Sequence, residues 1–177
     1  MSRLIENAAK AAGPHEKCQA KRLPVCTWVV PALASARAHS NVISRLADSF
    51  YQIEPLLRWA PRPAGGPFAS ANWPDGHANA MIVGPGGLER CYGIRIGVSL
   101  MAPHVRYPDH NHPQEEVYLV LSAGQFKHGA ASWYEPGIGG TFHNEPNIRH
   151  AMMSGGSPLL AIWCLWEESA ATARATT

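Results

Sequence analysis

Hydrophobic residues recur at helical spacing in one stretch of the chain, residues 40–60. The apolar positions follow each other at steps of three and four residues: Val42, Ile43, Leu46, Phe50, Ile53, Leu56 and Leu57. This spacing predicts an amphipathic helix with Ser40 or Asn41 as its N-cap and Pro61 beyond its end. Pro55 is expected to kink or divide the helix. The apolar stripe needs a surface to cover, and the strands predicted after it supply one.

After residue 79 the pattern changes to short strands separated by turns. The connection over residues 60–79 is rich in proline, glycine, alanine and asparagine. Short β-prone runs bounded by glycine or proline then follow, at 80–83, 91–101, 117–121, 125–126, 132–134, 140–143, 151–153 and 159–165. This pattern of short strands and turns predicts an all-β fold with an N-terminal helix, in which the helix packs on the outside of a sandwich or jelly-roll barrel.

The same patterns divide the chain into four segments around a single barrel. Residues 1–39 have mixed polarity and no sustained period, so we expect a weakly ordered leader there. A cleaved signal within residues 1–38 is the less favoured alternative, because Pro31 interrupts a short apolar run. Residues 40–79 are the helix and its connecting loop, residues 80–168 the barrel, and residues 169–177 a frayed tail.

Composition narrows the classes of function. The chain has 177 residues, 46% hydrophobic and 16% charged, which is typical of one globular domain. A formal net charge of +2, with scattered basic residues, argues against nucleic acid. No apolar run approaches the roughly 20 residues that span a bilayer. The four cysteines form no CxxC pair, so we expect reduced thiols and a cytoplasmic protein.

Histidines and a carboxylate are concentrated around residues 110–118. On an extended chain, residues of equal parity share a face, and His110, His112, Glu116 and Tyr118 are all even. A turn at residues 113–115 can return Glu116 to the side of the histidines, and His150 is placed to join them. Burying these groups without a partner would cost several kcal/mol, which a metal removes. We therefore predict one divalent metal ion, with zinc, iron, manganese or nickel suited to such ligands.

These residues carry a resemblance to a known superfamily over residues 80–166. His110-x-His112-x3-Glu116, followed by Gly124, resembles the first motif of the cupins. Gly140-x5-Pro146-x3-His150 resembles the second motif, although its proline-to-histidine spacing is one residue shorter and Asn147 stands near the customary glycine. The resemblance implies a single cupin jelly-roll barrel.

Two tyrosines, Tyr107 and Tyr118, narrow the resemblance to the cupin-type dimethylsulfoniopropionate (DMSP) lyases. It implies metal ligation by His112, Glu116 and His150, with His110 and Tyr118 at or beside the metal. It also implies a carbon–sulfur lyase that converts DMSP to dimethyl sulfide and acrylate by β-elimination, with zinc or iron as the first choice of metal. The catalytic candidates are Tyr118 as base, because a nearby cation favours the phenolate, together with Tyr107 and His110.

A sulfonium leaving group calls for aromatic faces in the pocket. The candidates are Tyr107, Trp133, Trp163 and Trp166, and for Trp133 a structural role is favoured. Trp163 and Trp166 have opposite parity on one predicted strand, so at most one of them faces the interior.

Other functions on the same fold stay open. An iron-dependent cupin dioxygenase could use the same ligands, although a tyrosine beside an oxygen-activating iron is a liability. A non-catalytic cupin could bind a small ligand without metal. A sugar-phosphate isomerase is less favoured because no basic cluster lies near the motifs. The expected partner is a small molecule, and a homodimer is compatible with the fold because such barrels frequently pair through strand edges.

Overall fold

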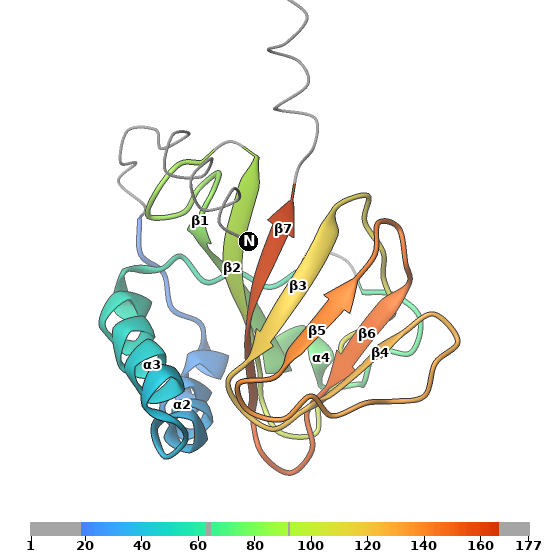
Figure 1. The fold of residues 1–177 in the computed structure, drawn as a ribbon, viewed down its shortest axis with the longest axis horizontal. Coiled ribbons are helices and arrows are strands. Elements are labelled where there is room, and N and C mark those ends of the chain that lie inside the picture. Colours follow the sequence, from blue (N-terminus) through green and yellow to red (C-terminus); the bar gives the residue numbers. More distant parts are fainter. Residues whose placement is uncertain (1–18, 63–64, 92, 167–177) are drawn as a thin grey trace, which may run out of the picture.

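Two antiparallel sheets form the body of the protein in a computed structural model that describes residues 19–62, 65–91 and 93–166. The larger sheet has the order β1-β2-β7-β3-β5 and the smaller one pairs β4 with β6 (Figure 1). The strands are β1 (His77–Val83), β2 (Ile94–Met101), β3 (Glu115–Val120), β4 (Gln125–His128), β5 (Thr141–Asn144), β6 (His150–Met153) and β7 (Leu159–Trp166). The helical elements are η1 (Pro24–Trp28), α2 (Val29–Arg37), α3 (Asn41–Ile53), η2 (Glu54–Leu56) and α4 (Trp73–Gly76).

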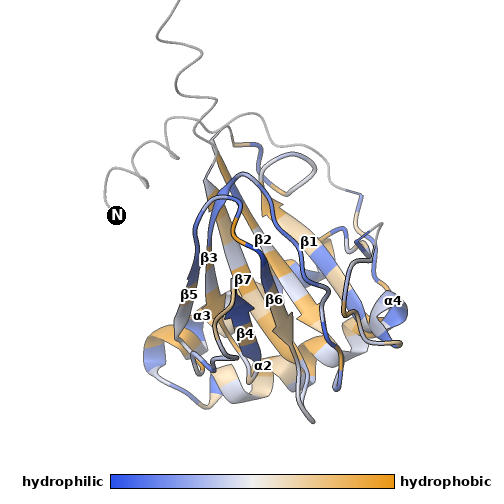
Figure 2. Cartoon of the chain, turned by 90° about the vertical axis from the view of Figure 1, so that its right-hand side faces the viewer, coloured by the Kyte–Doolittle hydropathy of each residue, from blue (hydrophilic) through white to orange (hydrophobic). Residues whose placement is uncertain are grey.

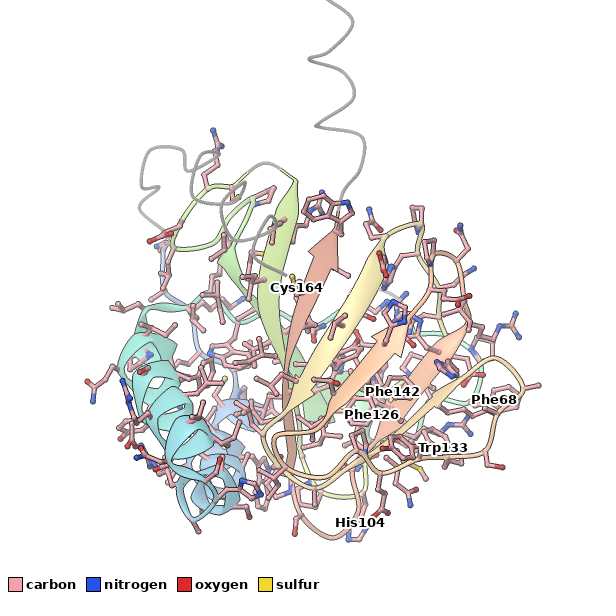
Figure 3. The ribbon with its side chains drawn as sticks, viewed as in Figure 1. Phe68, His104, Phe126, Trp133, Phe142 and Cys164 are labelled. Atoms are coloured by element: carbon pink, nitrogen blue, oxygen red, sulfur yellow. The ribbon has the colours of Figure 1, made fainter. Side chains whose placement is uncertain are left out.

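Alternation along the strands gives the larger sheet two apolar faces. On β7, Leu160 and Ile162 belong to a core shared with the helices. Leu159 and Ala161 point the other way and join a second core, which includes Phe126 of β4 and Phe142 of β5. Figure 2 shows hydrophobic positions along β2 and β7 of the larger sheet. The second core closes the interior between the two sheets, where Phe126 and Phe142 lie side by side (Figure 3).

The helices α2 and α3 lie together over the outer face of the larger sheet (Figure 1). The predicted helix over residues 40–60 is confirmed as α3, whose N-cap is Ser40 and whose buried side is Ile43, Ala47 and Phe50. Pro55 divides it as expected, because the α-helix ends at Ile53 and the chain continues as the short 3₁₀ helix η2.

The expectation of a weakly ordered leader does not hold for residues 24–37, which form η1 and α2. Val29, Leu33 and Ala36 are buried against the sheet and α3. Pro31 lies in the first turn of α2, where a missing N–H removes no helical hydrogen bond. Residues 1–18 and the tail predicted over 169–177 lie outside the described residues. In the described part of the chain, no helix is long and apolar enough to cross a membrane.

The predicted strands are otherwise found within a few residues of their expected positions, with one exception. The strand expected at residues 132–134 is wrong, because only Tyr134 pairs, in an isolated bridge to Phe126. Its neighbour Trp133 instead stacks against the guanidinium of Arg106. The connection over residues 60–79 contains the short helix α4, which begins next to Pro74 and was not predicted.

Candidate metal centre

A cavity of about 200 Å³ opens between the sheets and contains most of the residues singled out from the sequence. Its lining includes Tyr107, His110, His112, Glu116, Tyr118 and Trp163. This volume is below the 300 to 1,000 Å³ typical of pockets for drug-sized ligands, so the cavity suits a small molecule.

Three histidines converge in this cavity. One ring nitrogen from each of His110, His112 and His150 lies within 4.8 Å of the others. A backbone bridge brings two of them together, because His110 N donates to His150 O at 3.0 Å and His150 N donates to His110 O at 2.8 Å. The loop before β3, which carries His110 and His112, therefore lies next to the start of β6, which carries His150.

The backbone fixes which nitrogen of each ring carries the proton. The Nδ1 atom of His110 lies 2.9 Å from Pro108 O, and that of His150 lies 3.0 Å from Ile148 O. His112 Nδ1 lies 3.0 Å from Gln114 O. Because a carbonyl oxygen only accepts, Nδ1 must be the donor in all three rings, which leaves a lone pair on each Nε2 of the neutral form. Metal-binding histidines in proteins are oriented in the same way.

Glu116 adds a buried carboxylate beside these lone pairs. Its Oε2 lies 3.4 Å from His112 Nε2 and 3.1 Å from His150 Nε2, and it accepts a hydrogen bond from Asn144 Nδ2 at 3.0 Å. Burial raises the pKa of this carboxyl, but the hydrogen bonds that His112 and His150 donate when their rings are protonated outweigh it and lower the pKa to about 2. Burial and the neighbouring His150 lower the pKa of His110 to about 3.

The donor set fits a divalent cation. His150 Nε2 is buried and has no hydrogen-bond partner among the described residues. When the rings are neutral, it faces the Glu116 carboxylate and two further imidazole lone pairs, and none of these groups then has a proton to offer. A cation would satisfy all of them, and imidazole nitrogen with carboxylate oxygen is a donor set that binds transition metals.

Asn147 explains how the shortened second motif still places His150. Its φ of 62° lies in the left-handed region, which asparagine tolerates better than most residues and which glycine adopts freely. The N–H of Asn147 donates to His112 O at 2.8 Å. Asparagine thus takes a glycine-like conformation and joins the turn before His150 to the loop that carries His112.

Both tyrosines are buried at the cavity. Burial, followed by the charge of Glu116, raises the pKa of Tyr118 well above its ordinary value. Tyr107 accepts a hydrogen bond from Asn79 Nδ2 at 3.1 Å, and Asn79 Oδ1 accepts one from Ser99 Oγ at 2.7 Å. Since Asn79 donates to it, the Tyr107 hydroxyl is free to donate its own proton elsewhere.

The strand register places the two β7 tryptophans differently. Trp163 pairs with Tyr118 on β3 and lines the cavity with it. Trp166 pairs with the exposed residue Glu115 and is not part of the cavity lining. Gly97 on β2 pairs with Trp163, and a Cβ at this position would overlap the indole ring. Trp133, labelled in Figure 3, has the guanidinium of Arg106 over its ring and is not part of the cavity lining.

Sequence reasoning missed several polar residues of the site: Arg62, Asn79, Ser99 and Asn144. Asn79 and Ser99 are polar positions inside otherwise apolar strands, a signal that strand parity could have detected. Arg62 lies in the connection before α4, where no periodic pattern exists, so only the tertiary structure reveals its place.

Comparison with known proteins identifies relatives of this chain. A family model described as dimethylsulfoniopropionate lyase matches residues 1–161. The crystal structure of the DMSP lyase DddQ from Ruegeria pomeroyi DSS-3 has a TM-score of 0.76 at 20% identity, covering 90% of this chain and 79% of that chain. A structure of the DMSP lyases RdDddP and RnDddQII has a TM-score of 0.71 at 22% identity, covering 90% and 83%.

A more distant likeness extends to a cupin-2 domain protein from Rhodospirillum rubrum. Its TM-score is 0.50 at 10% identity, over 68% of this chain and 83% of that chain. No curated protein matches the chain. At these identities the structural likenesses establish the fold, and they confirm the predicted cupin architecture.

Proposed function

Because the chain belongs to the dimethylsulfoniopropionate lyase family, we propose that it cleaves DMSP to dimethyl sulfide and acrylate by β-elimination in this cavity. The observation that carries the proposal is the convergence of three oriented imidazoles and an ionised carboxylate next to a buried tyrosine. We further propose His112, Glu116 and His150 as metal ligands, with His110 at or beside the metal and zinc or iron as the ion. The free thiols of Cys26 and Cys164 favour a cytoplasmic location.

The elimination needs a base at the carbon next to the carboxylate, and Tyr118 is the residue proposed for it. Its phenolic oxygen takes the α-proton, the electron pair of that C–H bond forms the double bond of acrylate, and the C–S pair leaves with dimethyl sulfide. A bound divalent ion would supply positive charge that favours the Tyr118 phenolate and stabilises the developing negative charge of the substrate. Glu116 is too strongly acidic for this step, with a pKa of about 2.

Trp163 is proposed to receive the sulfonium group. A cation over an indole face gains about 0.5 to 2 kcal/mol, depending on how far it is desolvated. Trp163 lies directly opposite Tyr118 in the β3–β7 ladder, so a substrate held at its ring is close to the proposed base. The proposed substrate is small and suits the cavity volume of about 200 Å³.

The test is dimethyl sulfide release from DMSP by the purified protein after metal loading, without oxygen and with a chelator-treated control. We expect release that the chelator abolishes. Release only in the presence of oxygen would support the dioxygenase instead, and no release from a sample with stoichiometric metal would refute the lyase. Tyr118→Phe should abolish turnover while metal content stays stoichiometric, whereas Tyr134→Phe, at an exposed tyrosine, should behave as wild type.

A further inference from the structure

We propose that Arg62 binds the carboxylate of the substrate and thereby sets its orientation, with the sulfonium end directed toward Trp163. The inference rests on the proposed function in one respect only, namely that the substrate carries both a carboxylate and a cation. It assigns Arg62, a residue in the connection before α4, as the part of the cavity that binds an anionic group.

The backbone around Arg62 is held firmly against β1. Ala60 and Asn79 exchange two backbone hydrogen bonds of 2.9 Å each. Two residues further on, Arg62 N donates to His77 Nε2 at 2.9 Å, and His77 is itself buried and stacked on Trp73. The start of the arginine side chain is therefore fixed, although the residue lies in a connecting segment.

The guanidinium reaches the cavity beside Tyr107. Its Cζ lies 5.8 Å from the centroid of the Tyr107 ring, and Arg62 lines the cavity together with Asn79 and Ser99. His110 and Tyr118 line the same cavity as Arg62. Arg62 is thus close to the reacting groups.

Arg62 has no carboxylate partner among the described residues, in contrast to Arg22, Arg37 and Arg106. Arg22 pairs with Glu54 at 2.6 Å, Arg37 with Asp48 at 2.8 Å, and Arg106 with Asp109 at 2.9 Å. Glu116 is the sole carboxylate in the described cavity lining, and its Oε2 is engaged by Asn144, His112 and His150. The guanidinium of Arg62 contacts Tyr107 but no carboxylate among the described residues. A planar guanidinium in this situation, at the wall of a small cavity, is suited to a ligand carboxylate.

The same charge determines where the sulfonium can lie. Arg62 already places a cation near the Tyr107 ring, so a second cation there would be repelled. Trp163 lies on β7, and β2 separates it from β1, against which Arg62 is anchored. The cavity lining therefore contains both a positive charge, anchored against β1, and an indole ring from β7.

Binding of two fragments of the substrate tests the assignment independently of turnover. Propionate represents the anionic end and trimethylsulfonium the cationic end, and both are titrated calorimetrically into metal-loaded wild type, Arg62→Met and Arg62→Lys. Arg37→Met is the matched control, because Arg37 also stacks on a tyrosine, at 4.6 Å from the Tyr51 ring, but lies on the helical layer.

We expect Arg62→Met to weaken propionate binding by about 10- to 100-fold, the effect of losing a hydrogen bond to a charged group. Trimethylsulfonium should bind Arg62→Met as well as wild type or more tightly, because a repelling charge is gone. Arg62→Lys should fall between Arg62→Met and wild type for propionate, and Arg37→Met should match wild type for both fragments. In turnover of DMSP, KM should rise more than kcat falls.

Unchanged propionate binding in Arg62→Met would overturn the assignment, as would an equal loss of both fragments or no propionate binding by wild type. Failure of the lyase proposal is a separate result: wild type then binds propionate through Arg62 but releases no dimethyl sulfide.

Discussion

Replacing Asn144 with leucine separates metal affinity from fold stability at this site. Asn144 is fully buried on β5, donates to Glu116 Oε2 at 3.0 Å, and faces Glu116 directly in the β3–β5 ladder. Its Oδ1 is buried and has no hydrogen-bond partner within the described structure. Leucine has a similar size, removes the hydrogen bond to the carboxylate, and also removes the unsatisfied oxygen.

The two expected effects differ in magnitude. Loss of a group that orients a metal ligand typically costs 10- to 100-fold in metal affinity, or about 1.4 to 2.7 kcal/mol. In the metal-free protein, the lost hydrogen bond to a charged group costs about 1.5 to 3 kcal/mol, while removing an unsatisfied buried oxygen recovers about 1 to 3 kcal/mol. The midpoints of these two ranges nearly cancel, so we expect the free energy of unfolding of the metal-free protein to change by less than about 1 kcal/mol.

Metal affinity is measured by competition with a chromophoric chelator, and stability by urea unfolding of the metal-free protein. Ser122→Ala is the control with the opposite expectation, because Ser122 Oγ is buried and bonds Pro158 O and Leu160 N away from the cavity. The Ser122→Ala variant should lose about 1 to 3 kcal/mol of stability while its metal affinity stays unchanged. Unchanged metal affinity in Asn144→Leu, or a loss that follows a loss of stability, would refute the role assigned to Asn144.

Three further outcomes are expected. Glu116→Gln removes the ionised ligand, so metal content after dialysis, measured by elemental analysis, should fall well below one equivalent while circular dichroism stays native. Gly97→Ala brings a Cβ into the ring of Trp163 and to 2.7 Å from a backbone carbonyl, so Trp163 fluorescence should shift and stability should drop by about 1 to 3 kcal/mol. Burial lowers the pKa of His77, so as the pH falls below 6.5 the unfolded state binds this proton more readily than the folded state, and the metal-free protein should lose stability. His77→Gln, compared with wild type by urea unfolding across this pH range, should lose less stability as the pH falls. An identical pH profile of the two proteins would exclude His77 as the source of the loss.

The parity of alternating residues was the most informative sequence signal. It correctly predicted that Glu116 and Tyr118 share one face of β3, which the structure shows to be the buried face. The intervening chain alternates accordingly, and the exposed Glu115 forms an ion pair with His143. Parity also predicted that Trp163 and Trp166 face opposite ways, but the choice between them required the β3–β7 register. The local sequence pattern shows which residues share a face of a strand, whereas the pairing of distant strands decides which of the two faces lies in the interior.

Features that depend on tertiary packing could not be predicted from the sequence. The helix α2 contains Pro31 and small apolar residues, and its burial is decided by the sheet and α3 beneath it. Arg62 belongs to a connection without periodicity, and its proximity to Tyr107 follows from the bridge between Ala60 and Asn79. Long-range contacts of this kind leave no spacing pattern along the chain.

Each of the three site imidazoles is anchored to a carbonyl within two residues of itself, and this bears on how an ion is exchanged. Rings held by their own loops need no ion to order them, so uptake and release require little rearrangement of the chain. Exchange is then governed by passage through the cavity mouth and by the concentrations of competing ions. One divalent ion could replace another in the mature protein without any unfolding, so the metal found in the site would follow the current supply rather than the ion present when the chain first folded.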